Sequence, residues 1–296
     1  MKKPIIKWVF ISVASVVALI LLVVYFPFLS DYFFKNNTTQ GELLKVALTA
    51  VAGFVAILVW HSSFRRAKAT EQQVAATVKS NVDTRFNNAV GHLGSENPTV
   101  VLGGIHALQK LATGNEPYQQ IVHNVFCSYL RENSAKHYEK VDFEKTPNKC
   151  PVIIQTLIDY LFKPYNNKEN IYKNFRSNLS FSTLINCDFR DIKIDNVDFS
   201  NCVLEKCKFH NGILNNCSFR DGTLKQCAFK SSAMNICRFD GGTLTECYFQ
   251  KGILTMCNFT NGILADCNFS DGTLNNCILY AELINTELPP NKITEK

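Results

Sequence analysis

Apolar residues recur every five positions between Ser177 and Leu279. Each unit has Leu or Phe at its centre and a small residue two places earlier, as in Gly212 before Leu214 and Cys217 before Phe219, and its other three positions are mostly polar. The centres are Leu184, Ile194, Leu204, Leu214, Leu224, Met234, Leu244, Leu254, Leu264 and Leu274, alternating with Phe189, Phe199, Phe209, Phe219, Phe229, Phe239, Phe249, Phe259 and Phe269, and then Leu279. A period of five fits neither a helix nor a simple strand. A strict period predicts a repeat architecture, in which stacked units share one core.

This pattern, over residues 177–288, resembles the pentapeptide-repeat family. The resemblance implies an all-β right-handed quadrilateral β-helix, in which four pentapeptides form one square coil. Positions 20 apart should then stack, so that Phe189 lies over Phe209 in one ladder, Phe199 lies over Phe219 in the opposite one, and the Leu positions form the other two walls. About five coils at ~4.8 Å each predict a rod roughly 25 Å long. A solenoid of this kind offers a long surface and rarely a catalytic pocket.

The last coil should be distorted, because one residue is missing from the period between Leu279 and Leu283. Pro289 and Pro290 follow and should end the rod, since proline cannot donate to a strand ladder.

Ten of the 12 cysteines lie inside the repeat, and each precedes a Phe or Leu by two positions. Gly takes the same position before several Leu residues, which favours Cys as a small buried filler over a disulfide framework or a metal site. Stacked cysteines ~4.8 Å apart exceed the ~3.8 Å Cβ separation of an easy disulfide. So many free thiols suit a reducing compartment.

Two apolar runs near the N-terminus predict a two-helix transmembrane hairpin. Residues 8–29 are uncharged, and residues 43–60 are interrupted only by Lys45, Thr49 and Gly53. A membrane-spanning helix needs about 20 apolar residues. A cleaved signal peptide is the alternative for the first run, but no A-x-A cleavage site follows it.

Basic residues flank both runs and predict their orientation. Lys2, Lys3 and Lys7 precede the first run, Arg65, Arg66 and Lys68 follow the second, and the loop between them contains Lys35 alone. The positive-inside rule then places both termini in the cytoplasm. Neither run contains polar residues that suggest a transport path, so the hairpin should be an anchor in the lipid bilayer.

Residues 69–170 show helical spacing and predict a small all-α segment, either a bundle or an armadillo-like pair of hairpins. Asn97 and Pro98 mark the start of a helix that Gly114 ends, and Pro117 opens the next one. A further apolar stretch, 153–161, should end at Pro164.

Residues 85–112, from the Arg85-Phe pair to the Leu-Gly-Gly-Ile-His-Ala-Leu core, are similar to a segment that precedes the repeats in bacterial membrane-anchored pentapeptide-repeat proteins. That resemblance implies a bacterial inner (plasma) membrane protein and no defined activity. Gly103 and Gly104 favour close helix packing, with a ligand contact as the alternative. His92, His106 and the His123/Cys127 pair have no further ligand at a recognisable metal-site spacing.

The distribution of charge argues against some of the possible functions. The net charge is +6, yet residues 171–288 contain 11 Lys and Arg against 12 Asp and Glu, so the rod lacks the basic face that direct nucleic-acid binding needs. Topoisomerase-binding DNA mimics of the family have strongly acidic rods and no membrane anchor. The chain contains no Walker loop, G-x-S-x-G or H-E-x-x-H motif, and His210, Arg220 and Arg238 should be exposed rod positions.

The sequence therefore predicts a hairpin over residues 1–68, a helical adaptor over 69–170, a β-helix over 171–288 and a tail over 289–296. We expect no enzyme activity, no catalytic or metal-binding residues and no cofactor. The favoured function is a cytoplasmic scaffold, anchored in the membrane, that binds a protein partner or itself through the β-helix. The alternatives are a membrane-perturbing sensor–effector in stress or phage defence and, less in keeping with the charge, a topoisomerase-binding DNA mimic.

Overall fold

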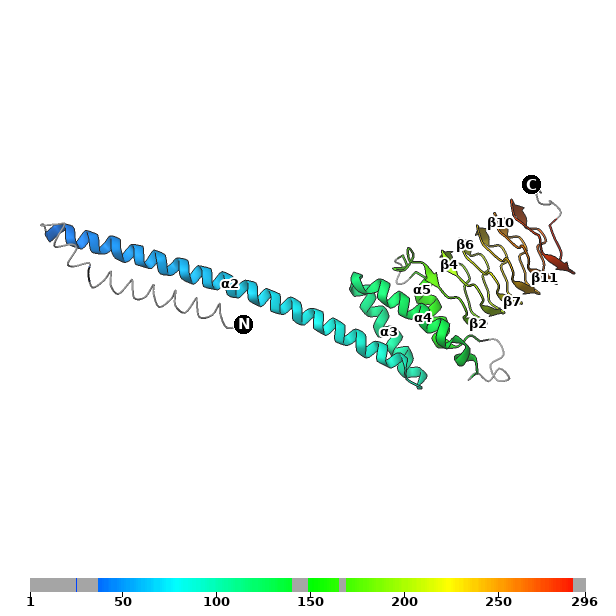
Figure 1. Cartoon of the computed structure of the whole chain (residues 1–296), viewed down its shortest axis with the longest axis horizontal. Coiled ribbons are helices and arrows are strands. Elements are labelled where there is room, and N and C mark those ends of the chain that lie inside the picture. The colour runs from blue at the N-terminus through cyan, green and yellow to red at the C-terminus, as the bar shows by residue number, and fades with distance from the viewer. Residues whose placement is uncertain (1–24, 26–36, 140–148, 165–168, 290–296) are drawn as a thin grey trace. The chain divides into compact units, whose positions relative to one another are not determined.

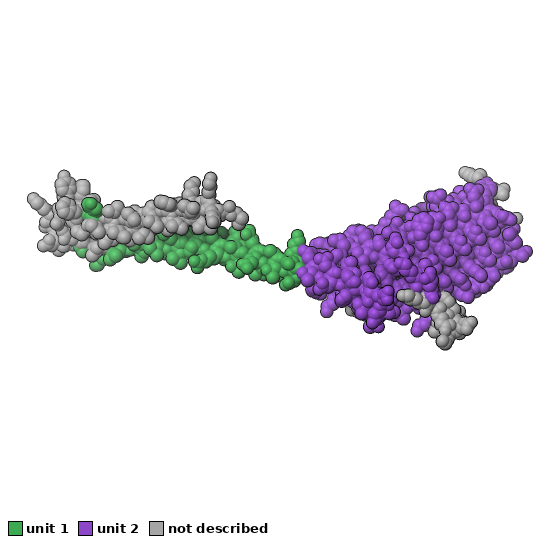
Figure 2. All heavy atoms as spheres, turned by 60° about the horizontal axis from the view of Figure 1, so that its bottom comes forward, with its two compact units in different colours: residues 1–81 green, residues 82–296 purple. Residues whose placement is uncertain are grey.

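The structure, a computed structural model, describes residues 25, 37–139, 149–164 and 169–289 of the chain (Figure 1). The chain divides into two compact units, residues 1–81 and residues 82–296 (Figure 2). Apart from Tyr25, the predicted span over residues 8–29 lies outside the described residues.

Helix α2 (Asn37–Leu93) contains the predicted second span and continues without a break through residues 68 and 69, where the sequence suggested a domain boundary. Large apolar side chains such as Leu48, Val55 and Val59 are exposed. A helix that is apolar on all sides normally lies in a core or a membrane. In the part of the chain that the structure describes, α2 contains the one segment long and apolar enough to cross a membrane, and no other element buries it. A two-helix hairpin is not seen among these residues.

Three further helices form a compact layer in the second unit: α3 (Pro98–Gly114), α4 (Glu116–Glu139) and α5 (Val152–Phe162). The predicted start and end of α3 are confirmed, and the side chain of Asn97 caps the helix by accepting a hydrogen bond from Thr99 N (2.9 Å). Apolar side chains of all three helices, among them Leu108, Phe126 and Leu157, are fully buried in a common core.

The chain then folds into short parallel strands that stack along the β-helix (Figure 1). The strands are β1 (Ser177–Asn178), β2 (Thr183–Ile185), β3 (Lys193–Asp195), β4 (Val197–Asp198), β5 (Val203–Glu205), β6 (Ile213–Asn215), β7 (Thr223–Lys225), β8 (Ala233–Asn235), β9 (Thr243–Thr245), β10 (Ile253–Thr255), β11 (Ile263–Ala265), β12 (Thr273–Asn275) and β13 (Glu282–Ile284). One wall is the sheet β2-β5-β7-β9-β11-β13, and another is the sheet β3-β6-β8-β10-β12. The remaining two walls are joined mainly by isolated parallel bridges, such as Lys208 with Ala228.

The predicted 20-residue register is confirmed along these walls, because Leu204 pairs with Leu224 and Leu224 with Leu244. Both predicted Phe ladders are also present, with stacked ring centroids between 4.5 and 5.0 Å apart. Rings from the two ladders meet edge to face across the interior, as Phe229 and Phe239 do at 6.0 Å. Stacked and edge-to-face arrangements both suit the quadrupole of the ring. The interior is therefore a filled core.

From Phe181 to Asn276, each corner of the square coil is formed by a residue in the left-handed conformation, two places after the central apolar residue. The non-glycine corner residues have φ between +46 and +63°. Asn and Asp tolerate this conformation better than other residues with a side chain, which explains their frequency at this position of the repeat.

Helix side chains take the place of a preceding coil at the N-terminal end of the β-helix. Ser134 Oγ in α4 accepts a hydrogen bond from Thr183 N (2.9 Å), and the Tyr138 hydroxyl accepts one from Ile185 N (2.8 Å). The Gln155 side chain in α5 accepts from Asp188 N (2.9 Å) and donates to Asp188 O (3.0 Å), as a peptide group of another coil would. An exposed strand edge invites pairing with other chains. The helical layer covers this one.

At the C-terminal end, the predicted shortening of the last coil is confirmed. Ile263 pairs with Glu282 and Asn268 with Glu287, so the register falls from 20 residues to 19. Leu283, the central residue of this coil, is 42% exposed, whereas its predecessor Leu264 is buried.

Candidate functional site

The cysteines of the β-helix lie inside it and present no reactive surface. All 12 cysteines are buried as free thiols. Most thiols of the repeat donate to a backbone carbonyl of the preceding coil, as Cys227 Sγ does to Leu204 O (3.4 Å). Burial raises the pKa of the Cys202 thiol to about 12. Because the thiolate is the nucleophile and the metal ligand, burial makes a thiol such as that of Cys202 a poor nucleophile at neutral pH.

The histidines of the helical layer have hydrogen-bond partners that explain their positions. His123 and Cys127 do come together (3.8 Å), and His123 Nε2 also lies 2.9 Å from Ser177 Oγ in β1. Burial lowers the pKa of His123, which favours its neutral form. His106 Nδ1 pairs with the Tyr160 hydroxyl at 2.6 Å.

Both His123 and Ser177 are almost completely buried, at 1% and 2% exposure, so a substrate could not reach them. Their contact ties α4 to the first coil. In the described part of the chain, no three His, Cys, Asp or Glu side chains lie close enough together to hold a metal ion.

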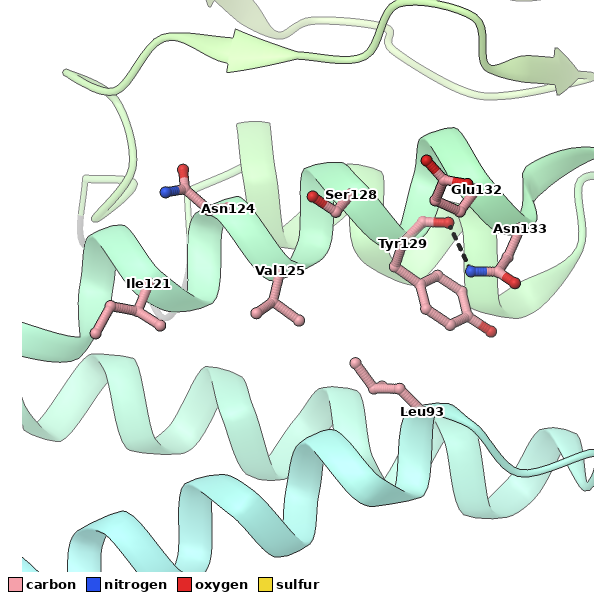
Figure 3. A pocket seen from close by; sticks show the side chains of 8 residues that line it. All are labelled: Leu93, Ile121, Asn124, Val125, Ser128, Tyr129, Glu132 and Asn133. Carbon is pink, nitrogen blue, oxygen red and sulfur yellow. Dashed lines mark hydrogen bonds between the residues drawn. The ribbon is translucent and has the colours of Figure 1, made fainter.

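A groove of about 450 Å³ runs between α4 and the C-terminal end of α2 (Figure 3). Leu93 of α2 lines it together with side chains of α4, among them the apolar Ile121 and Val125 and the polar Asn124 and Ser128. Among its polar lining residues, Asn133 Nδ2 donates to Tyr129 O (3.3 Å), and the Tyr129 hydroxyl pairs with His137 Nε2 (2.8 Å). The lining thus combines apolar and polar side chains of α4 with Leu93 of α2.

One face of the β-helix differs from the rest because it carries no charge over four consecutive coils. We define the uncharged face as the outward residues of β6, β8, β10 and β12 together with the corner residue that comes directly after each strand. These residues are Ile213, Asn215, Asn216, Ala233, Asn235, Ile236, Ile253, Thr255, Met256, Thr273, Asn275 and Asn276. The opposite sheet has Glu205, Lys206, Lys225, Glu246 and Asp266 in the corresponding positions.

The apolar side chains of the uncharged face are well exposed. Ile253 and Met256 are 54% and 51% exposed, and Ile213 and Ile236 are similar. These residues lie on neighbouring coils, because β6 pairs with β8 and β8 with β10. A contiguous apolar patch on a soluble surface is typical of an interaction site.

Two of these residues also occupy backbone positions that suit them poorly. Ile236 and Met256 are left-handed corner residues, with φ of +55° and +52°, where Asn216 and Asn276 stand in neighbouring coils. A β-branched residue with positive φ is a genuine outlier. The exposed Ile236 therefore costs stability both by strain and by exposure, and such outliers often mark functional positions.

A row of basic residues borders the uncharged face on the preceding wall of the coil. It consists of Lys208, His210, Lys230 and Lys251, and the pentapeptides that contain them have no acidic residue. The pKa of His210 is lowered by partial burial and by the positive charges of Lys230, Arg190 and Lys208. The β-helix is nearly neutral as a whole, yet three lysines lie along this edge of it, before Asp271 in the next coil.

Sequence reasoning placed His210 on the surface, where it is partly exposed, but it overlooked the uncharged face. The signal was available, since outward positions 20 apart can be compared once the coil length is known.

Residues 182–221 and 244–279 match the family described as pentapeptide repeats, in eight copies. No curated protein matches the chain. Solved structures with a similar fold include the pentapeptide-repeat protein Rfr23 from the cyanobacterium Cyanothece 51142, at 19% identity over 33% of this chain and 65% of that one, with a TM-score of 0.29. This chain thus spans less than two thirds of Rfr23.

Two other solved structures resemble the β-helix. HetL, a pentapeptide-repeat protein involved in heterocyst differentiation regulation in Nostoc sp. strain PCC 7120, shares 13% identity over 39% of this chain and 86% of its own, with a TM-score of 0.16. QnrB1, a plasmid-mediated fluoroquinolone resistance protein, shares 11% identity over 37% of this chain and 76% of its own, with a TM-score of 0.21.

Proposed function

We propose that this chain, whose C-terminal β-helix consists of pentapeptide repeats of that family, is a non-catalytic protein-binding scaffold anchored in a membrane. The observation that carries the proposal is the uncharged face, which combines exposed apolar side chains with a strained corner residue, Ile236. His123 and Ser177 are the pair that comes nearest to a catalytic base and nucleophile. Both are buried, which supports a structural role for their contact.

The apolar segment of α2 supports the membrane anchor. Its side chains are exposed on every side, and burying them in lipid would remove that surface from water. We further propose that both termini lie in the cytoplasm of a bacterium, since basic residues such as Arg65 and Arg66 follow this segment. Buried free thiols suit the same compartment.

The chemistry of the surface indicates the kind of partner. Ile253 and Met256 would pack against apolar side chains, while Lys230 and Lys251 would pair with carboxylates beside them. We therefore expect a protein partner with an acidic segment that also contains apolar residues. The charged contacts should steer association and weaken with added salt.

Two matched substitutions on opposite sheets test the proposal. Ile253 in β10 and Thr243 in β9 are both exposed strand residues. Full-length wild-type, Ile253→Asp and Thr243→Asp proteins would be purified from cells in mild detergent, and co-purifying proteins would be quantified by mass spectrometry. We expect a near-stoichiometric protein with the wild type and Thr243→Asp that is lost, by at least tenfold, with Ile253→Asp. Equal recovery with both variants would refute a role for the uncharged face, and self-association alone would replace the partner by a second copy.

A further inference from the structure

Two cysteines approach each other where the helical layer meets the β-helix. Cys150 Sγ lies 3.2 Å from Cys187 Sγ, although the residues are far apart in sequence. The Tyr138 hydroxyl lies beside both sulfurs, 3.3 Å from Cys187 Sγ and 3.7 Å from Cys150 Sγ. The same hydroxyl donates to Ile185 O (3.1 Å), which fixes its position over the first coil.

This pair differs from the other cysteines of the chain in how its members are held. Cys187, Cys207 and Cys227 occupy the same position in successive coils, and the ladder keeps such residues ~4.8 Å apart, beyond the ~3.8 Å Cβ separation of a disulfide. Cys150 belongs to no coil. It stands directly before Pro151, the residue that precedes α5, and its sulfur can therefore approach Cys187 more closely than the ladder allows.

The two cysteines are both buried but differ in exposure. Cys187 is completely buried, whereas Cys150 retains 8% exposure at the boundary of the helical layer. Cys150, the more exposed of the two, should therefore react first, with Cys187 as the resolving thiol.

We propose that Cys150 and Cys187 form a reversible disulfide that locks the helical layer onto the first coil of the β-helix under oxidising conditions. The oxidant we infer is a low-molecular-weight disulfide of the glutathione type. This inference does not depend on the proposed function, because it concerns the junction between α5 and the β-helix and no partner.

The reaction proceeds by two thiol–disulfide exchanges. The Cys150 thiolate attacks one sulfur of the small disulfide, forms a mixed disulfide and releases one small thiol. The Cys187 sulfur then attacks the Cys150 sulfur and releases the second small thiol, which takes the Cys187 proton. In sum, two protein thiols are oxidised to one disulfide and one small disulfide is reduced to two thiols. Burial raises the pKa of Cys187 well above its ordinary value, so the second exchange should be the slow one.

Peptide mapping of the full-length protein tests this proposal. Trypsin cleaves after Lys149, Arg176 and Arg190, which places Cys150 and Cys187 in separate peptides with no other cysteine. Detergent-purified wild-type, Cys150→Ser and Cys202→Ser proteins would be incubated with oxidised glutathione, alkylated without reduction and digested. Cys202 is the matched control, because it is a buried thiol of the β-helix that donates to Leu179 O (2.9 Å).

We expect a linked peptide pair, lighter by two hydrogens, in the wild type and in Cys202→Ser but not in Cys150→Ser. Its formation should consume two thiols per chain and raise the melting temperature, and dithiothreitol should reverse both changes. Glutathione retained on Cys150 with Cys187 still free would overturn the proposal, as would a linked pair that leaves the melting temperature unchanged.

Discussion

At one corner of the β-helix, an exposed apolar residue stands where a different residue would give a more stable fold. Asn216 Nδ2 donates to Asn196 Oδ1 of the preceding coil (2.7 Å), so these corner residues form a side-chain ladder. Ile236 interrupts that ladder with an apolar, β-branched residue at φ +55°. A residue chosen for folding alone would be Asn. Contact with the proposed protein partner would account for the Ile side chain.

The substitution Ile236→Asn should therefore stabilise the β-helix while weakening partner binding. Relief of the left-handed strain contributes about 1 kcal/mol, and a new amide contact with Asn216 would add to it. Chemical denaturation of the full-length protein would measure the first effect and partner recovery the second. A loss of stability would show that Ile236 is not strained, and unchanged recovery would remove it from the binding surface.

The residues inside the β-helix could be placed from the sequence, whereas those on its surface could not. The stacking of Phe189 on Phe209 followed from the five-residue period together with the four-pentapeptide coil that the family resemblance implied. The conformation of Ile236 could be anticipated only once the corner of each coil was located. The Cys150–Cys187 contact could not be predicted, since it depends on how α5 docks.

Among the elements, the contact between α2 and α3 rests on one glycine. A Cβ atom at Gly104 would lie 2.8 Å from Ala89 O and 2.9 Å from His92 Cβ, whereas a Cβ at Gly103 would meet nothing within 4 Å. The sequence suggested close packing for both glycines. The structure assigns it to Gly104 and leaves Gly103 exposed.

The adjacent substitutions Gly104→Ala and Gly103→Ala should have opposite effects. Gly104→Ala must separate α2 from α3 and should destabilise the second unit by about 1–3 kcal/mol. Gly103→Ala removes a flexible residue from a helix interior and should stabilise it by about 0.5–1 kcal/mol. Thermal or urea unfolding of the two variants would compare them. Equal effects of the two would refute the packing contact.

The sequence also predicted the helices without predicting their role. Their boundaries follow from local signals such as Asn97 and Pro98. The replacement of a missing coil by Ser134, Tyr138 and Gln155 depends on which surface of α4 and α5 meets β2, and no local pattern encodes that choice.

For the whole molecule, a scaffold anchored in a membrane requires the apolar segment of α2 to lie in the bilayer. Val55 lies inside this segment, and Val78 lies beyond it on the same helix, and both are exposed. An Arg near the centre of a span costs about 3 kcal/mol of insertion free energy. The predicted first span, residues 8–29, would have to be removed so that the second is tested alone.

In a chain that begins at Asn37, Val55→Arg should therefore release the protein from membranes and Val78→Arg should not. Resistance to alkaline carbonate extraction measures the membrane-bound fraction. We expect that fraction to fall several-fold with Val55→Arg. Complete extraction of the parent chain would refute α2 as an anchor, as would equal retention of the two variants.

Contact between the uncharged face and a protein is the central claim, and site-specific photo-crosslinking in living cells tests it most directly. A photoreactive residue at position 253 should give one discrete crosslinked product that the same residue at position 243 does not give. The double substitution Lys230→Glu and Lys251→Glu should abolish that product, because the new glutamates would repel the carboxylates of the partner that pair with these lysines. The same products from both positions, or products from position 243 alone, would contradict the account.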